Sequence, residues 1–274
     1  MKTWFITGAS RGFGALIVAA VLASGDAVVA TARDPSSLPD HPRLLKLSLD
    51  VTNEGQAREA AASAIAKFGR IDVLVNNAGY GLLGAVEEAS AVEIERVYAT
   101  NVFGLLNVTR AVLPHMRKQR SGHIINMSSI GGYASSSGWG VYCSTKFAVE
   151  GISEALSIEL APLGIHATVV EPGYFRTDFL SAQSLSSTAV RIDDYADTVG
   201  KMRTFAAAAN HQQPGDPQRL ARAIVKLAGE QTPPTRLALG SDTVARIEEK
   251  NGDVQRELDL WRSVSISTDF VAAT

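Results

Sequence analysis

Tyr142 and Lys146 are the residues whose types and spacing most directly indicate chemistry in this sequence. They stand four positions apart, so on a helix they share one face. A free tyrosine has a pKa of about 10 and is seldom a base at neutral pH, but a neighbouring ammonium favours the phenolate and lowers that pKa. We therefore expect Tyr142 to be a general acid in a reduction and a general base in an oxidation.

A glycine-rich segment near the N-terminus, Thr7–Gly14 (TGASRGFG), provides the second chemical signal. Gly8 permits a tight turn, Gly12 lets the backbone approach a phosphate, and Gly14 lets the following helix pack closely. The N-terminus of that helix would offer free N–H groups and a partial positive charge to a pyrophosphate. A turn that only connects a strand with a helix is the alternative, but together with the tyrosine–lysine pair the segment predicts a nicotinamide cofactor.

Short runs of β-forming residues alternate with helical stretches along the chain. The runs that we expect to be strands are Thr3–Thr7, Ala27–Thr31, Leu44–Leu49, Ile71–Asn76, Gly122–Met127, Ile165–Val170 and Arg236–Leu239. The stretches that we expect to be helices are Phe13–Ser24, Gly55–Phe68, Val141–Leu160 and Arg222–Ala228, with one or two more within Glu88–Met116. Such alternation predicts an α/β fold, a Rossmann-type doubly wound parallel sheet of about seven strands with helices on both faces.

We expect residues 1–274 to form a single dinucleotide-binding catalytic domain. The polar, alanine-rich segment Phe179–Pro217 breaks the alternation, and a long insertion of this kind is more often a lid over a site than a disordered linker. We therefore predict a substrate lid over 179–217 and a C-terminal extension after residue 240. Because the motifs occupy the strand ends, the lid, together with Trp139 and Tyr174, should determine substrate preference.

The composition excludes several other classes of protein. The net charge of −2 predicts no basic face for nucleic acid. The single cysteine, Cys143, excludes an intramolecular disulfide and a cysteine-based zinc site, and the five histidines have no metal-ligand spacing, so no metal is expected. The apolar stretch Ala15–Ala23 is too short to span a bilayer and no signal peptide is visible, so we expect a cytoplasmic protein.

Several motifs together resemble the short-chain dehydrogenase/reductase family. The glycine turn has that family's spacing, Thr-Gly-x-x-x-Gly-x-Gly, and the tyrosine and lysine match its Tyr-x-x-x-Lys. The residues that carry the resemblance, from about Lys2 to about Thr177, are Thr7–Gly14, Asn76–Gly79 (NNAG), Asn101, Ser129, Tyr142–Lys146, Pro172, Gly173 and Thr177.

The resemblance implies a role for each of these residues. Ser129 would hydrogen-bond the substrate oxygen and stabilise developing negative charge. Lys146 would also hold the hydroxyls of the nicotinamide ribose, and Asn101 would hold a water in a proton relay behind this lysine. The catalytic residues would thus be Asn101, Ser129, Tyr142 and Lys146. The expected cofactor contacts are Gly8, Ser10, Arg11, Gly12, Phe13, Gly14, Arg33, Asp50, Val51, Asn77, Ala78, Gly79, Tyr142, Lys146, Pro172, Gly173 and Thr177.

Two of these assignments have competing interpretations. Ser128 competes with Ser129, which we prefer because it precedes a small-residue turn, Ile130–Gly132, as the family's serine does. Asp50 and Val51 resemble the family's adenine contact, but a polar residue there could instead cap the following helix. The candidates for that cap are Asp50, Thr52 and Asn53.

Two arginines bear on the identity of the cofactor. Arg33 follows the second expected strand, where an acidic residue would bind the ribose hydroxyls of NAD and a basic one pairs with the 2′-phosphate of NADP. Arg11 lies in the glycine turn, and two guanidiniums could converge on this phosphate. Asp34 is the competing residue. We favour NADP(H) over NAD(H).

The sequence thus predicts an NADP(H)-dependent oxidoreductase that interconverts a carbonyl and a secondary or primary alcohol by hydride transfer. Val141–Ile165 resembles family members that act on steroids, retinoids and other lipophilic alcohols, so a small lipophilic substrate is expected. A cofactor-binding redox sensor with little turnover is the alternative, against which the intact serine, tyrosine and lysine argue. The glycine spacing disfavours a sugar-nucleotide epimerase.

The resemblance also implies a homodimer or homotetramer. Helices equivalent to Asn101–Met116 and Val141–Leu160 pair between subunits in the family.

Overall fold

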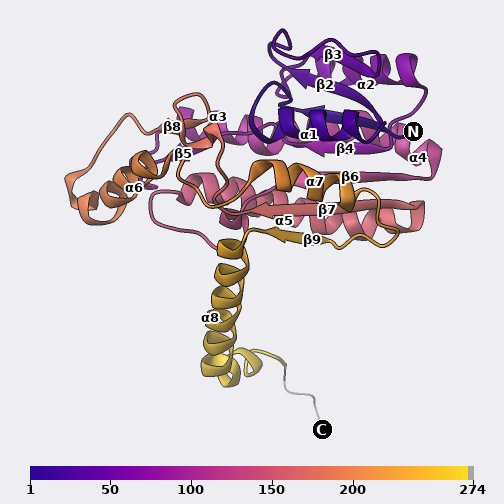
Figure 1. Ribbon diagram of the computed structural model, residues 1–274. Coiled ribbons are helices and arrows are strands. Elements are labelled where there is room, and N and C mark those ends of the chain that lie inside the picture. The colour runs from indigo at the N-terminus through magenta and orange to yellow at the C-terminus, as the bar shows by residue number, and fades with distance from the viewer. Residues whose placement is uncertain (271–274) are drawn as a thin grey trace.

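The computed structural model describes residues 1–270 and contains a seven-stranded parallel sheet with the strand order β3-β2-β1-β4-β6-β7-β9 (Figure 1). The strands are β1 (Thr3–Thr7), β2 (Ala27–Ala32), β3 (Leu44–Ser48), β4 (Val73–Asn76), β6 (Gly122–Met127), β7 (Ile165–Pro172) and β9 (Arg236–Leu239). The predicted doubly wound sheet is therefore confirmed. Strands β2 and β3 lie on one side of β1, and β4 and the strands after it lie on the other side. In sheets of this kind a crevice opens where the chain changes sides, here between β1 and β4.

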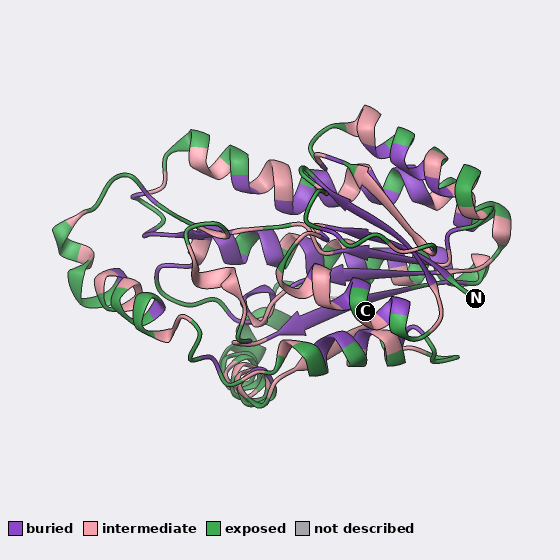
Figure 2. Ribbon diagram, turned by 45° about the horizontal axis from the view of Figure 1, so that its top comes forward, coloured by how far each residue is buried: buried purple, intermediate pink, exposed green. Residues whose placement is uncertain are grey.

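Helices cover both faces of the sheet because the strands are apolar on both sides. Successive residues of a strand point to opposite faces, so Trp4 and Ile6 of β1 pack with α1 and α7, whereas Phe5 packs with α2, α4 and α5. Figure 2 shows the central strands as buried, whereas the residues of the edge strands β3 and β9 are mostly only partly buried. The bounds of these helices are α1 (Gly12–Ala23), α2 (Glu54–Phe68), α4 (Leu105–Gln119), α5 (Gly140–Leu160) and α7 (Pro217–Leu227).

Helix α7 begins earlier than the sequence analysis predicted. It starts at Pro217 instead of Arg222 because Asp216 accepts hydrogen bonds from the N–H groups of Gln218 and Arg219. A capping aspartate followed by a proline in the first turn is a common helix start, and this signal had been assigned to the lid.

The stretch Glu88–Met116, expected to hold one or two helices, contains three helical segments. Helix α3 (Ala91–Tyr98) continues through a π-helix, η1 (Ala99–Gly104), into α4. Single π turns inside helices often occur at functional sites, and η1 contains Asn101.

The insertion after β7 has regular structure of its own. Its strand β8 (Leu185–Ser187) pairs in parallel with β5 (Gly81–Leu83) to form a second, two-stranded sheet. The short helical segments of the chain, those of the insertion included, are η2 (Ile130–Gly132), η3 (Ala161–Leu163), η4 (Asp178–Leu180), η5 (Asp193–Tyr195), η6 (Ala196–Gly200) and α6 (Lys201–Ala209).

Residues Ser241–Ile266 form one long helix, α8, which extends away from the sheet beyond β9 (Figure 1). From residue 254 to residue 270 every residue is exposed, including Leu260 at 78% and Trp261 at 60%. Among residues 1–270, the structure has no helix that is both long enough and apolar enough to cross a membrane.

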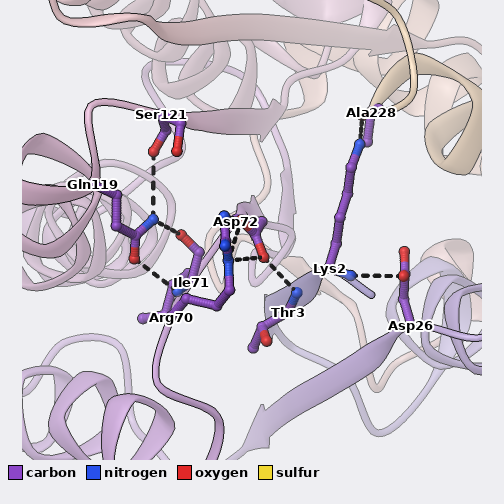
Figure 3. Close-up of polar contacts among 9 residues, drawn as sticks. All are labelled: Lys2, Thr3, Asp26, Arg70, Ile71, Asp72, Gln119, Ser121 and Ala228. Carbon is purple, nitrogen blue, oxygen red and sulfur yellow. Dashed lines mark hydrogen bonds and ion pairs between the residues drawn. The ribbon is translucent and has the colours of Figure 1, made fainter.

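Polar contacts fix the amino ends of the central strands (Figure 3). The Asp72 carboxylate accepts from Thr3 N at 2.8 Å and from Arg70 Nε at 2.8 Å, so the chain before β4 is joined to β1. The Gln119 side chain, at the end of α4, donates to Ile71 O at 2.8 Å and accepts from Ile71 N at 3.2 Å. These backbone groups would otherwise lack partners at the end of the sheet.

The close contact between α1 and the sheet generates a test. A Cβ on Gly14 would overlap Gly8 O and lie 2.8 Å from Asn77 Nδ2, so Gly14→Ala should lower the free energy of unfolding by about 1–3 kcal/mol. The matched control is Gly151→Ala in α5, where a Cβ meets nothing within 4 Å and the free energy of unfolding should rise by up to about 1 kcal/mol. Urea denaturation measures both; equal stability of the two variants would contradict the packing argument.

Candidate active site

A cavity of about 860 Å³ lies beyond the carboxyl ends of the parallel strands. Its wall is formed by the glycine turn, the ends of β2, β3, β4, β6 and β7, the start of α5, and the insertion. Of the predicted cofactor residues, Gly14 lies behind the wall. Those that line it are Gly8, Ser10, Arg11, Gly12, Phe13, Arg33, Asp50, Val51, Asn77, Ala78, Gly79, Tyr142, Lys146, Pro172, Gly173 and Thr177.

The glycine turn is held in place by the end of β4. Gly8 and Gly12 have φ values of +62° and +53°, which favour glycine. Asn77 Nδ2 donates to Thr7 O at 2.9 Å and to Gly8 O at 3.0 Å, while Thr7 Oγ1 accepts from the N–H groups of Asn77 and Ala78. The Asn77 side chain therefore shapes the turn, and its contact with the cofactor stays a prediction.

Helix α1 begins without a side-chain cap. Its N-cap residue, Arg11, is extended and makes no capping hydrogen bond. The first N–H groups of a helix need partners, and here they face the cavity beside Gly12, where a Cβ would meet nothing within 4 Å. This arrangement fits an anionic group such as a pyrophosphate.

Tyr142 and Lys146 lie together on α5, both 7% exposed. Lys146 Nζ is 5.8 Å from the centroid of the Tyr142 ring and donates to Met127 O at 2.8 Å. Ser129 follows β6, and its Oγ accepts from Gly131 N at 3.1 Å. The Ser129 hydroxyl is close enough to the phenol to lower the pKa of Tyr142, whereas Ser128 is directed at Gly132 and Glu150.

The expectation that the pKa of Tyr142 lies below its ordinary value is not met in this structure. Burial raises the pKa of Tyr142 well above its ordinary value, and the Ser129 hydroxyl offsets only part of this effect. Burial also lowers the pKa of Lys146 to about 8, while Glu150 acts in the opposite direction. The phenol therefore carries its proton at neutral pH, as a proton donor must.

Asn101 is positioned behind Lys146 by η1. Its Nδ2 donates to Tyr80 O at 2.9 Å and to Thr145 Oγ1 at 3.1 Å, and its Oδ1 accepts from Tyr80 N at 3.1 Å. A Cβ on Gly79 would lie 3.1 Å from Asn101 Oδ1, which is a tight contact, and 3.6 Å from Lys146 Nζ. The water expected at Asn101 stays a prediction.

The two arginines expected to converge on one phosphate have different surroundings. Arg11 Nη2 donates to Gln183 O of the insertion at 2.5 Å, so in this structure it contacts the insertion and does not join Arg33. The sequence did not predict this hydrogen bond because Gln183 is 172 positions away from Arg11 and lies in a segment without a motif. Asp34, the competing residue, accepts a hydrogen bond from Ser36 N at 2.9 Å. The Ser36 hydroxyl and this backbone N–H lower the pKa of Asp34.

A third arginine, Arg96 of α3, lines the cavity together with Arg33. Both charges act on Tyr80, which also lines the cavity: burial raises the pKa of Tyr80, and the charges of Arg96 and Arg33 offset part of this increase. Within residues 1–270, neither guanidinium has a hydrogen-bond or ion-pair partner. Sequence reasoning missed Arg96 because it stands on a peripheral helix outside the motifs.

Asp50 lines the cavity, but one of its oxygens serves the local turn. Asp50 Oδ1 accepts from Thr52 N at 2.9 Å and from Thr52 Oγ1 at 2.7 Å. Of the candidates for the cap of α2, the structure uses Asn53, whose Oδ1 accepts from Gln56 N at 3.0 Å.

The wall beside Pro172 depends on a residue of α8 that carries no motif. Asp242 Oδ2 accepts from Tyr174 N at 2.7 Å, and a Cβ on Gly173 would overlap the same carboxylate. Thr177 caps η4 by accepting from Phe179 N at 3.3 Å.

Apolar side chains form the end of the cavity next to Tyr142. The rings of Trp139, Tyr142 and Phe179 contact one another, with centroids 5.7 Å apart for Trp139–Tyr142 and for Tyr142–Phe179. Leu83, Leu180, Leu185 and Met202 belong to the same cluster. Cys143 is also in it, and burial raises the pKa of this thiol, so it is not an activated nucleophile.

A buried ion pair joins the insertion to the loop before α3. Glu88 is fully buried, and its carboxylate accepts from Arg203 Nη2 at 2.6 Å, from Ala85 N at 2.7 Å and from Ile192 N at 2.9 Å. Burial alone would raise the pKa of Glu88, but these donors together outweigh it and lower the pKa to about 2.

Comparison with known proteins agrees with the fold and the motifs. Residues 2–187 match the family model described as short chain dehydrogenase. A 3-ketodihydrosphingosine reductase of Bacteroides thetaiotaomicron is 41% identical over 86% of this chain and 86% of its own length. A short-chain dehydrogenase structure from Streptomyces avermitilis has a TM-score of 0.92 and 41% identity, covering 98% of this chain and 99% of that one. ElxO with NADP bound has a TM-score of 0.74 and 28% identity, covering 89% and 99%.

The chain belongs to the short-chain dehydrogenase family. It is an oxidoreductase, and similar solved structures hold either NADP or NADH.

The Glu88–Arg203 pair generates a prediction. Arg203→Ala would leave a buried carboxylate without its cation and should cost about 3–5 kcal/mol of stability at pH 7. Lys201→Ala is the matched control, because Lys201 pairs with Asp197 at 2.9 Å in an exposed position and its loss should cost less than about 1 kcal/mol.

The sign of the pH dependence provides a second readout on the same variants. The pKa of Glu88 is lower in the native protein than in the unfolded chain. This difference stabilises the fold at pH values above the pKa of the unfolded chain, and the stabilisation is lost as the pH falls toward about 2. In Arg203→Ala the deficit should therefore be large at pH 7 and shrink in acid, where the carboxyl is neutral. Urea titrations at pH 7 and pH 4 test this; a deficit that does not change with pH would contradict it.

Proposed function

We propose that this protein is an NADP(H)-dependent oxidoreductase that interconverts a lipophilic carbonyl compound and its alcohol, with Tyr142 as the acid or base. One observation carries the proposal. A protonated phenol, a buried ammonium and the Ser129 hydroxyl meet on one wall of the cavity, between a phosphate-accepting helix N-terminus and an apolar end. The cofactor and the substrate would occupy these two ends.

The proposed mechanism follows from the positions of these side chains. A bound nicotinamide supplies the hydride in reduction and takes it up in oxidation. Tyr142 gives its proton to the carbonyl oxygen, and Ser129 donates a hydrogen bond to the same oxygen as negative charge develops. Lys146 stabilises the phenolate that remains, and Asn101 holds the backbone of Tyr80 beside that lysine.

The apolar end supports a lipophilic substrate. Three aromatic rings, Leu180 and Leu185 line the cavity at the phenol, and hydrophobic walls with a few polar groups are typical of small-molecule sites. The relative named 3-ketodihydrosphingosine reductase supports a ketone as the class of substrate.

The insertion is proposed to act as the lid. Residues 179, 180 and 182–186 line the cavity, whereas residues 188–203 are fastened through Thr188, Ile192 and Arg203 to Glu88 and its neighbours. We therefore assign the movement of the lid to its first part, residues 178–187, with the Arg11–Gln183 hydrogen bond as the contact that must open.

A homo-oligomer is proposed from exposed apolar side chains on the helices named for this role. Phe103 of η1, just before α4, and Phe147 and Ile158 of α5 are 56%, 45% and 69% exposed. The free thiol of Cys143 is consistent with the proposed cytoplasmic location.

The preference for NADP(H) is proposed to rest on Arg33 and Arg96. Both line the cavity without a partner in the described part of the chain, and both charges act on Tyr80. A dianionic phosphate placed between them would satisfy both guanidiniums, which suit bidentate phosphate binding.

The first prediction for this function concerns the proton donor. Tyr142→Phe should reduce turnover roughly 10²–10⁴-fold or more, because only the transferable proton is lost while the ring still packs against Trp139. Cofactor affinity should be nearly unchanged. Tyr98→Phe is the control, because the Tyr98 hydroxyl contacts Ser144 outside the cavity. Steady-state kinetics with a panel of ketones and NADPH measures both variants. Near-normal turnover by Tyr142→Phe would contradict the proposed mechanism.

The second prediction concerns the cofactor. Arg33→Ala and Arg96→Ala should each weaken NADPH binding by roughly 1.5–3 kcal/mol and hardly change NADH binding. Arg11→Ala should leave the ratio of the two affinities unchanged, because Arg11 contacts the insertion. Fluorescence titration of all three variants with both cofactors measures this. If the wild type prefers NADH, or if Arg33→Ala weakens the binding of both cofactors equally, Asp34 and not Arg33 determines the cofactor preference.

A further inference from the structure

Lys146 is a buried cation that touches no carboxylate. Its side chain is 7% exposed, and its Nζ donates to a backbone carbonyl, Met127 O. Within residues 1–270 it forms no ion pair. Transfer of an ammonium from water into a protein interior is costly unless an opposite charge compensates it. A compensating charge must therefore act on Lys146 from beyond direct contact.

Glu150 stands one helical turn after Lys146 on the same face of α5. It is 5% exposed and is packed under η2, next to Gly132. A Cβ on Gly132 would lie 3.0 Å from Glu150 Oε1, 3.0 Å from Lys146 O and in overlap with Ser128 Oγ. The carboxylate is thus enclosed between the backbone of the lysine and the strand end that carries Ser129.

Three carboxylates surround one guanidinium behind Glu150. Arg236 of β9 pairs with Glu150, with Glu154 at 2.6 Å and with Glu171 of β7 at 3.5 Å. The side chains of Glu150 and Glu171 are 6% and 2% exposed, whereas that of Glu154 is 59% exposed. One cation therefore serves two buried acids, and burial raises the pKa of both carboxyls.

We propose that Glu150 is a positioning residue of the active site, whose carboxylate, held by Arg236, keeps Lys146 in its charged form. Its effect on Tyr142 is indirect, through the ammonium. This inference rests on the proposed function for its catalytic meaning, but the charge of Lys146 can be measured without any substrate.

The protonation behaviour of these groups supports the geometry. Burial lowers the pKa of Lys146 to about 8, and Glu150 is the group that raises it. Burial raises the pKa of Glu150 to about 7; Glu171 acts in the same direction, and Ser128 and Arg236 act against it. Glu150 is therefore ionised in the pH range in which Lys146, with a pKa of about 8, loses its proton. The other groups packed around Lys146 are the uncharged Tyr142 and Asn101.

The sign of the effect follows directly. A lysine loses its charge as the pH rises through its pKa. If the Glu150 charge is removed, the pKa of Lys146 falls below about 8 and the ammonium is lost within the neutral range. A less charged Lys146 stabilises the Tyr142 phenolate less, so the phenolate would form only at higher pH.

The test is a titration of Lys146 by NMR in protein labelled with ¹³C at lysine Cε. The Lys146 signal is identified by its absence in Lys146→Arg. The titration midpoint should fall by roughly one pH unit in Glu150→Gln and return in Glu150→Asp. It should not move in Glu154→Gln, the matched control, which removes a carboxylate from the same guanidinium at an exposed position.

Glu171→Gln provides a variant with the opposite expectation. Without Glu171, the pKa of Glu150 falls and Glu150 is more fully ionised, so the Lys146 midpoint should rise. This variant decides the question if Glu150→Gln does not fold. An unchanged midpoint in Glu150→Gln, an equal shift in Glu154→Gln, or a lower midpoint in Glu171→Gln would overturn the proposal.

A kinetic measurement separates this inference from the proposed function. In alcohol oxidation, the pH of half-maximal kcat should move upward in Glu150→Gln and stay in place in Glu154→Gln. If Tyr142→Phe retains turnover while the Lys146 midpoint still shifts in Glu150→Gln, the proposed function fails and the charge relation stands. If Tyr142→Phe is inactive and the midpoint does not move, the positioning role of Glu150 fails alone.

Discussion

The hydrogen bonds between Thr7, Gly8, Asn77 and Ala78 are the constraint on which the site depends. They join the end of β1 to the end of β4, the two strands between which the order of the sheet reverses. Because one asparagine amide satisfies two carbonyl oxygens of the turn, the turn is rigid before any ligand binds. Its left-handed glycines then leave the first N–H groups of α1 facing the cavity.

The polar groups of the site are compatible with burial because each is held by several elements. Lys146 and Glu150 come from one helix, but their partners belong to β6, β7 and β9. Burial makes both the phenol and the ammonium sensitive to nearby charges, since charges interact more strongly in an interior than in water. The burial that raises the pKa of Tyr142 therefore also strengthens the effect of the Glu150 carboxylate, one helical turn away, on the pKa of Lys146.

Much of the fold was predictable because parallel strands are buried on both faces. Runs such as Ile165–Val170 read as strands without any tertiary information, and the glycine turn has a geometry that few residues other than glycine adopt. The class of sheet, parallel and doubly wound, was predictable from the alternation of such strands with helices. Helix starts were less certain, as Asp216 and Pro217 show.

What the sequence did not reveal depends on contacts between distant residues. Arg203 lies 115 positions from Glu88, and nothing local marks either as half of a buried pair. Arg11 was assigned to a phosphate because its motif lies there, but its guanidinium reaches a carbonyl of the insertion. Helix α8 was not predicted because residues 254–270 bury no face, so no core-facing periodicity distinguishes them.

The hydrogen bond from Tyr174 N to Asp242 gives the C-terminal part of the chain a share in the cavity wall. All the family motifs end at Thr177, so a chain cut just after β9 would still contain every one of them. It would nevertheless lack the carboxylate that fixes the turn after Pro172, beside which Gly173 has no room for a side chain. Possession of the motifs and completion of the wall are therefore separate properties, and the second requires the beginning of α8.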